Sequence, residues 1–165
     1  MTLPHRTLYF FNHDLRYCDN QALHAAAQRG SVLIIFIDDR TYPHSWSVGS
    51  AGKVWLHHAL KYLSNQLPST HKNAYYRGDP IAIISRICQQ NNIDAVMWNS
   101  PQTPWANKRD QALSARLANL NIAFTCFKNH TLWPSDTILK DNGTPYQVFT
   151  PVSYTHLTLP TNREV

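Results

Sequence analysis

The sequence predicts a doubly wound α/β fold, with a five-stranded, mostly parallel sheet and helices on both of its faces. Two observations support this Rossmann-like arrangement. Short apolar runs of strand length alternate along the chain with longer segments in which apolar residues recur at helical spacing. The clearest apolar run, residues 31–39, begins after a glycine and stops at two aspartates, which is typical of a strand buried on both faces. Strand, helix and strand in this order form a right-handed crossover between parallel strands.

The first half of the chain supplies two strands and two helices. Residues 7–11 form the first strand, and Gly30 terminates the helix that follows it. After the second strand, residues 40–50 mix aromatic, Pro, Gly and Ser residues without a period, which indicates a loop. Residues 51–66 then form a long amphipathic helix, in which we expect Trp55 to face the core.

The second half of the chain repeats the alternation. A short tyrosine-rich strand at residues 73–77 leads to Asp79 and Pro80, the N-cap and first residue of the next helix. The strand at residues 94–98 then brings Asn99 to the carboxyl edge of the sheet. The remaining elements are a helix, a fifth strand and an irregular stretch with a tight Asp-Asn-Gly turn, at residues 106–120, 122–127 and 128–151.

Length and composition indicate one globular domain, which we place at residues 1–151 of the 165. Apolar residues make up 43% of the chain and charged residues 15%. No apolar run approaches the length of a membrane span and no cleavable leader is recognisable, so we expect a cytoplasmic monomer without membrane contact. The net charge of +5 is spread along the chain and favours an anionic partner only weakly.

The sequence contains no organised group of catalytic or metal-binding residues. Cys18, Cys88 and Cys126 lie far apart and the nine histidines are scattered, so we expect neither a disulfide framework nor a metal site. We expect Cys88 and Cys126 to pack as small hydrophobic residues. Neither the glycine fingerprint of dinucleotide-binding proteins nor a phosphate-binding loop with GK[ST] occurs. The pattern therefore favours a binding domain without catalytic residues.

The polar loop after the first strand marks the predicted binding edge, because ligands collect outside the carboxyl ends of parallel strands. Asp14, Arg16, Asp19 and Asn20 all lie in this loop. Two structural interpretations stay open beside the functional one. Asp19 or Asn20 is an N-cap of the following helix. Asp14 and Arg16 pair with each other or with a neighbouring domain, and a surface ion pair of this kind contributes about 0–1 kcal/mol.

Six short motifs in this order resemble the N-terminal α/β domain of class I DNA photolyases and cryptochromes. They are FNHDLRYCDNQAL, IIFIDD, SAGKVWLHHALKYL, RGDP, DAVMWN with PW and KRD behind it, and GTPYQVFTP. The resemblance implies that this domain holds an antenna chromophore, either a folate or a deazaflavin. It also implies a partner, the C-terminal FAD domain of the same protein, which is missing from this chain and which contacts the damaged DNA. The full-length protein is then a DNA photolyase, a carbon–carbon lyase that splits pyrimidine dimers by electron transfer from photoexcited FAD, and this fragment alone is inactive.

The predicted crevice and the resemblance together indicate eight cofactor-binding residues: Asn12, Asp14, Arg16, Asp38, Arg40, Asn99, Trp105 and Lys108. Folate-binding relatives place a carboxylate near the positions of Trp105 and Ala106, whereas residues 100–107 contain no acid. A pterin ring binds well to a carboxylate, because a carboxylate accepts from two N–H groups. A deazaflavin, another flavin or an empty pocket therefore agrees with the sequence as well as a folate does.

Two other functions stay open, and the end of the chain departs from the resemblance. A cryptochrome-type blue-light photoreceptor shares this domain, and a stand-alone nucleotide-binding α/β protein has a related fold. Residues 152–165 resemble translated sequencing-adapter sequence, so we expect a non-native or disordered tail. We also expect an exposed, poorly soluble aromatic surface where the FAD domain is missing, formed by Trp46, Trp133, Tyr146 and Phe149.

Overall fold

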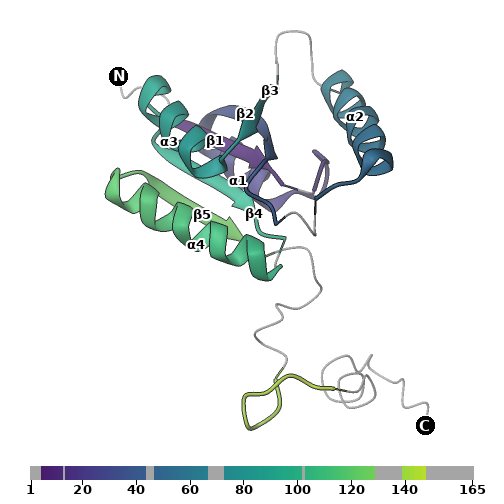
Figure 1. The fold of residues 1–165 in the computed structure, drawn as a ribbon. Coiled ribbons are helices and arrows are strands. Elements are labelled where there is room, and N and C mark those ends of the chain that lie inside the picture. Colours follow the sequence, from purple (N-terminus) through teal and green to yellow (C-terminus); the bar gives the residue numbers. More distant parts are fainter. Residues whose placement is uncertain are drawn as a thin grey trace, which may run out of the picture. The chain divides into compact units, whose positions relative to one another are not determined.

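A five-stranded parallel sheet forms the centre of the fold (Figure 1). The structure is a computed structural model that describes residues 5–12, 14–43, 47–66, 73–101, 103–128 and 139–147. The chain divides into two compact units, Met1–His130 and Thr131–Val165. The sheet and all four helices described below belong to the first unit.

The sheet confirms the predicted fold class. Its strands stand in the order β3-β2-β1-β4-β5 and every neighbouring pair is parallel. The strands, in chain order, are β1 (His5–Phe11), β2 (Gly30–Asp39), β3 (Ala74–Gly78), β4 (Ala95–Asn99) and β5 (Ala123–Phe127). The strand order reverses between β1 and β4, so the topological switch point lies where these two strands end.

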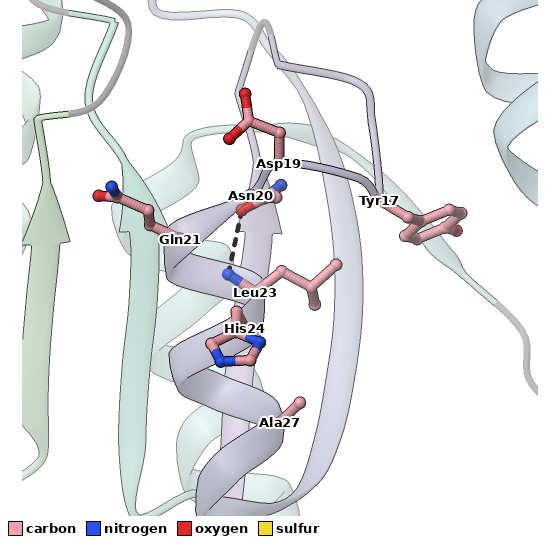
Figure 2. A pocket seen from close by; sticks show the side chains of 7 residues that line it. All are labelled: Tyr17, Asp19, Asn20, Gln21, Leu23, His24 and Ala27. Carbon is pink, nitrogen blue, oxygen red and sulfur yellow. Dashed lines mark hydrogen bonds between the residues drawn. The ribbon is translucent and has the colours of Figure 1, made fainter.

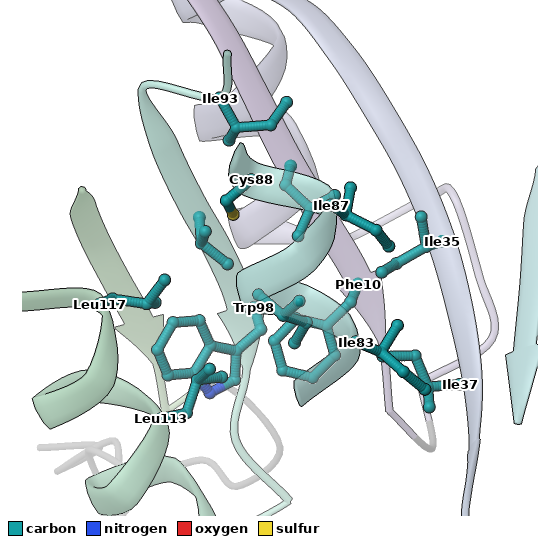
Figure 3. Close-up of a cluster of buried hydrophobic side chains, with 13 residues drawn as sticks. Phe10, Ile35, Ile37, Ile83, Ile87, Cys88, Ile93, Trp98, Leu113 and Leu117 are labelled. Atoms are coloured by element: carbon teal, nitrogen blue, oxygen red, sulfur yellow. The ribbon is translucent and has the colours of Figure 1, made fainter. Parts of the chain in front are cut away.

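Helices cover the sheet in two pairs. The helices are α1 (Gln21–Arg29), α2 (Ser50–Asn65), α3 (Pro80–Asn91) and α4 (Pro104–Asn119). Side chains of α3 and α4 pack with Leu8 and Phe10 of β1 in one buried cluster, part of which Figure 3 shows. Side chains of α1 and α2 pack with Tyr9 and Phe11 in a second cluster. Alternate residues of β1 thus face opposite layers, as the two-residue period of a strand requires.

Side-chain N-caps fix the first residues of three helices, α1, α3 and α4. The side chain of Asn20 accepts from the N–H of Leu23 at 3.0 Å, and that of Asp79 accepts from the N–H of Ile81 at 3.0 Å, so both predicted N-caps are confirmed. The predicted start of the last helix at residue 106 is wrong. Thr103 is its N-cap and Pro104 its first residue, which places Trp105 in the first turn.

Gly30 both ends α1 and begins β2, which makes this connection very tight. Its φ is 138°, a conformation that favours glycine, and an added Cβ would lie 2.7 Å from the carbonyl oxygen of His5. The predicted helix stop at Gly30 is confirmed, although no loop separates the helix from the strand.

Three predicted burial assignments are wrong. Trp55 is 64% exposed, because Leu56, Leu60 and Leu63 form the inner side of α2 and Trp55 lies about a quarter turn away. Strand β2 is fully buried only around Ile35 and its next two residues, since its first residues lie near the surface. Cys126 is exposed because β5 is an edge strand.

The second unit is described only at residues 139–147, where the predicted tight turn is present. Leu139 and Pro145 form an antiparallel bridge, and Gly143 has a φ of 75°. Tyr146 is half-buried there, so the prediction that it is exposed is wrong. Trp46, Trp133, Phe149 and the predicted tail at residues 152–165 lie outside the described residues. In the described part of the chain, no helix combines the length and apolar character needed to cross a membrane.

The three thiols differ in burial, and this predicts their order of reaction. Cys88 is buried, which raises its pKa to about 12, so at pH 8 its thiol is both protonated and shielded. Although Cys126 is exposed as a residue, partial burial of its sulfur and then the Asp110 carboxylate, 3.9 Å away, raise the pKa of Cys126 to about 11. At pH 8 we expect an aromatic disulfide reagent to label the exposed Cys18 first, Cys126 more slowly and Cys88 only after unfolding. Peptide mass spectrometry of timed samples checks this order, and rapid native labelling of Cys88 would contradict it.

Candidate functional site

Five polar side chains gather at the switch point and form what we call the polar cluster: Tyr9, Asn12, Asp14, Asn20 and Asn99. Strands β1 and β4 each deliver a residue to this place, and the β1–α1 loop delivers the others. Asn12, Asp14, Asn20 and Asn99 are each at least nine-tenths buried. Buried polar groups require partners, and the cluster supplies most of them internally.

The side-chain amide of Asn99 lies at the centre of the polar cluster. Its Nδ2 donates to Asp14 Oδ2 and to Asn20 Oδ1, the second at 2.8 Å. Because both partners are acceptors, the amide has only one satisfactory orientation. Its Oδ1 is therefore directed elsewhere, and it is buried without a hydrogen-bond partner among the described residues. A buried acceptor in this state fits a donor from water or from a ligand.

Tyr9 joins the two ends of the β1–α1 loop. Its hydroxyl donates to Asp14 Oδ2 at 3.2 Å and accepts from Asn20 Nδ2 at 2.7 Å. Burial, and then the negative charge of Asp14, raise the pKa of Tyr9 far above its ordinary value, so the phenol stays protonated. Asn12 completes the cluster, since its Nδ2 donates to the backbone oxygen of Asn99 at 2.7 Å.

Arg16 belongs to the cluster only through its backbone. Its carbonyl oxygen accepts from Asn20 Nδ2 at 3.0 Å. Its guanidinium donates to the carbonyl oxygen of Asp19 at 3.0 and 3.2 Å and lies 3.8 Å from the Asp19 carboxylate. The alternative pairing of Asp14 with Arg16 is therefore wrong, and Arg16 braces the loop beside the cluster.

A shallow depression opens at the N-terminus of α1 (Figure 2), with a volume of about 380 Å³. Tyr17, Asp19, Asn20 and His24 are among its lining residues. Asp19 has a φ of 49°, the left-handed conformation that Asp tolerates in turns. Tyr17 links this loop to the start of β3, because its hydroxyl exchanges hydrogen bonds with the Asn73 side chain at 2.9 and 3.2 Å.

An ion-pair group lies at the ends of β2 and β3. Asp38 Oδ2 accepts from Arg40 at 2.8 Å and from Arg77 at 2.9 Å. All three side chains are substantially exposed, between 36% and 72%. Solvent screening therefore limits this group to a small contribution to stability.

The third group lines an open apolar depression of about 230 Å³, which we call the aromatic cavity. Its lining residues are Pro43 from the β2–α2 loop and Pro104, Trp105 and Lys108 from the first turns of α4. Tyr42 stands beside Trp105, with ring centroids 4.3 Å apart and planes inclined by 43°. Aromatic and proline surfaces with one amine at the margin suit a flat ring that carries polar or anionic substituents.

The structure divides seven of the eight predicted residues into separate groups, and Arg16 lies beside the polar cluster. Asn12, Asp14 and Asn99 meet in the polar cluster, Trp105 and Lys108 meet at the aromatic cavity, and Asp38 and Arg40 form an ion pair. Tyr9, the second role of Asn20, and Tyr42 were not predicted from the sequence. Tyr9 carried a signal, because a tyrosine in a buried strand needs a hydrogen-bond partner for its hydroxyl. Among the described residues, no three His, Cys, Asp or Glu side chains are grouped as metal ligands would be.

Taken together, a parallel sheet with a polar cluster and an aromatic cavity outside its carboxyl edge defines a doubly wound α/β binding domain. The chain belongs to the DNA photolyase family, whose sequence model matches residues 7–163. It is 30% identical over 146 residues to the deoxyribodipyrimidine photo-lyase of Agrobacterium fabrum, covering 87% of this chain and 30% of that protein.

Two further comparisons agree. The crystal structure of a class III photolyase from Agrobacterium tumefaciens superimposes with a TM-score of 0.83 and 28% identity, over 92% of this chain and 31% of that one. Cryptochrome-1 of Drosophila melanogaster is 29% identical over 152 residues, which cover 85% of this chain and 28% of that protein. The chain therefore spans about 30% of the length of the relatives that it matches.

Proposed function

We propose that this chain is the antenna-chromophore domain of a deoxyribodipyrimidine photo-lyase, which repairs ultraviolet-induced pyrimidine dimers in DNA with light. The observation that carries the proposal is the aromatic cavity at the carboxyl edge of a photolyase-family sheet. A light-harvesting pigment needs a rigid, dry surface that fixes the orientation of its ring. It needs no acid, base or nucleophile in contact with the ring.

The residues of the cavity fit such a pigment. Trp105 offers an aromatic surface and Lys108 offers an ammonium group for a polar or anionic edge. The volume of about 230 Å³ lies below the usual range of about 300–1,000 Å³ for complete ligand sites, so the cavity suits one ring system of a pigment. When bound, the pigment supplies absorption of near-ultraviolet or blue light.

The pigment is a deazaflavin or a folate. The resemblance implies that folate-binding relatives carry a carboxylate near position 106. In this chain residue 106 is a buried alanine in the first turns of α4. The missing carboxylate removes a strong acceptor for a pterin ring and leaves the two pigments equally consistent with the site.

In this proposal the FAD domain and damaged DNA are partners of the whole protein. The photolyase names of the relatives support the lyase activity, which requires FAD in the C-terminal domain. Asp14, the buried carboxylate at the switch point, already accepts from Tyr9, Asn12 and Asn99. Because this proposal places the electron-donating FAD in the C-terminal domain, we expect the isolated chain to be inactive in dimer repair.

Absorption spectroscopy tests the pigment. We expect the chain, expressed in a host that makes both folates and deazaflavins, to purify with a band in the near-ultraviolet or blue. The position of the band identifies the pigment. A Trp105→Ala variant should lose most of the band, because stacking of a flat heteroaromatic ring on one aromatic side chain contributes about 1–3 kcal/mol to the binding free energy. A colourless wild-type chain that also binds neither pigment on titration would refute the antenna role.

The similarity to a cryptochrome supports a second candidate, a blue-light photoreceptor. A light-dependent repair assay on the full-length protein separates the two, since only the photolyase removes pyrimidine dimers. A stand-alone nucleotide-binding protein would instead bind adenine nucleotides to this chain alone, which calorimetry would detect.

A further inference from the structure

Asp39, Arg109 and Asp110 form a buried ionic group, here called the ionic triad, that the proposed function does not yet use. The Nε and Nη2 atoms of Arg109 donate to Asp110 Oδ1 at 3.0 and 2.7 Å, and its Nη1 lies 3.8 Å from Asp39 Oδ2. The three side chains are only 8–11% exposed. Burying charges costs free energy, so a group of this kind must be well paired to persist.

The ionic triad contacts both walls of the aromatic cavity. On one side, Asp39 Oδ1 accepts from the backbone N–H of Thr41 at 2.8 Å and from its hydroxyl at 2.7 Å. This pair fixes the start of the loop that carries Tyr42 and Pro43. The other oxygen, Asp39 Oδ2, is buried without a hydrogen bond among the described residues. The positive charge of Arg109, 3.8 Å away, offsets part of the cost of burying this oxygen.

On the other side, Arg109 contacts the aromatic ring that lines the cavity. Arg109 follows Trp105 by four residues on α4, so the two side chains lie on the same side of the helix. The guanidinium carbon lies 5.2 Å from the Trp105 ring centroid and 5.8 Å from that of Phe10, both within cation–π range. Trp105 therefore contacts both the Arg109 guanidinium and the Tyr42 ring.

We propose that Arg109 is a positioning residue that sets the orientation of Trp105 and the spacing of the two cavity walls, and through them the orientation of a flat heteroaromatic ligand. The inference rests on the proposed function. Lysine does not replace arginine in this role, because only a planar guanidinium donates from two N–H groups to the Asp110 Oδ1 atom while it lies against aromatic rings. Orientation matters for an antenna, since excitation transfer depends on the angle between the transition dipoles of donor and acceptor.

The test compares Arg109→Lys with Arg116→Lys in the complete chain. Arg116 lies on the same helix, is exposed and has no partner among the described hydrogen bonds and ion pairs, so it controls for the substitution itself. Each protein is titrated with 5-deazariboflavin and, separately, with folic acid. We expect Arg109→Lys to keep the native far-ultraviolet circular dichroism, to bind the accepted ligand about tenfold more weakly, and to change its induced circular dichroism band. Arg116→Lys should match the wild-type chain in every measurement.

A measurement without ligand separates the two proposals. The Trp105 contribution to near-ultraviolet circular dichroism is obtained as the difference between the chain and its Trp105→Phe variant. We expect Arg109→Lys to reduce this contribution by about half, because the ring loses its contact with the guanidinium. If Arg109→Lys does not fold, Asp39→Ala serves instead, and it should produce the same change because it removes both the hydrogen bonds from Thr41 that fix the Tyr42 loop and the charge beside Arg109.

The outcomes are distinct. A wild-type chain that binds neither ligand refutes the proposed function, and the Trp105 signal alone then decides whether Arg109 positions the ring. A variant that binds as tightly as the wild type with an unchanged induced band overturns the positioning role and leaves the antenna role intact. An unchanged Trp105 signal overturns the positioning role as well.

Discussion

Replacing Asn99 with alanine is expected to lower the free energy of unfolding by about 2–4 kcal/mol. Asn99 Nδ2 is the donor for both Asp14 Oδ2 and Asn20 Oδ1, and all three residues are buried. Without the amide, a buried carboxylate oxygen loses a hydrogen bond, and the partner left behind costs about 1–3 kcal/mol, with more for a charged group. The substitution also leaves a small void at the end of β4.

Urea unfolding, followed by circular dichroism, measures this loss. Asn107→Ala is the matched control, because Asn107 is exposed on α4 and alanine is the better helix former, so we expect a change within about 0.5 kcal/mol. Equal midpoints for the two variants would show that water replaces the Asn99 amide without cost. The polar cluster would then be a solvated edge and would not hold the β1–α1 loop in place.

Most of the fold follows from local signals that agree with one another. The run at residues 31–39 and the Asp79–Pro80 helix start predict β2 and α3 because apolar length, capping chemistry and glycine placement all indicate the same structure. The errors arise where one signal is weak. Helix α4 starts at Pro104, two residues before the expected position. Thr103 alone is a weak N-cap signal, and only the combination of Thr103 with Pro104 at the first helical position indicates the helix start.

Burial on α2 was predictable only in part. Trp55 fits an apolar stripe as well as Leu56 does, and the choice between them depends on how the helix is rotated against the sheet. Tertiary packing sets that rotation, and the spacing of apolar residues along the helix does not predict it. The exposed Cys126 has the same origin, because nothing local shows that β5 is the edge strand.

The sequence predicts which loops form the candidate site, but it does not predict the contacts between their side chains. Asn12, Asp14 and Asn99 follow strand ends, so their shared edge comes from the parallel topology alone. Their hydrogen bonds to Tyr9 and Asn20 depend on the side-chain rotamers, which the sequence does not determine. The ionic triad is likewise hidden in sequence, because Asp39 and Arg109 are seventy residues apart and meet only through the crossing of α4 over the sheet.

Replacing Leu113 with alanine is expected to be the most damaging of the substitutions considered, with a loss of about 2–5 kcal/mol in the free energy of unfolding. Leu113 is fully buried in the cluster where Leu113 and Leu117 of α4 pack with Trp98 of β4 (Figure 3). Alanine loses the transfer free energy of the removed atoms and leaves a cavity, because the neighbouring indole ring and strand cannot close around the smaller side chain.

The control for this prediction is Trp55→Ala, a larger truncation at an exposed position. If burial decides the cost, this variant loses no more than about 0.5 kcal/mol although it removes more atoms. Thermal unfolding separates the two, since each kcal/mol shifts the midpoint by about 2–4 °C in a chain of this size. A larger loss for Trp55 than for Leu113 would mean that α2 is anchored through its outer side. Because α4 also carries Trp105, Lys108 and Arg109, the Leu113 variant that remains folded should bind pigment more weakly, and the Trp55 variant should not.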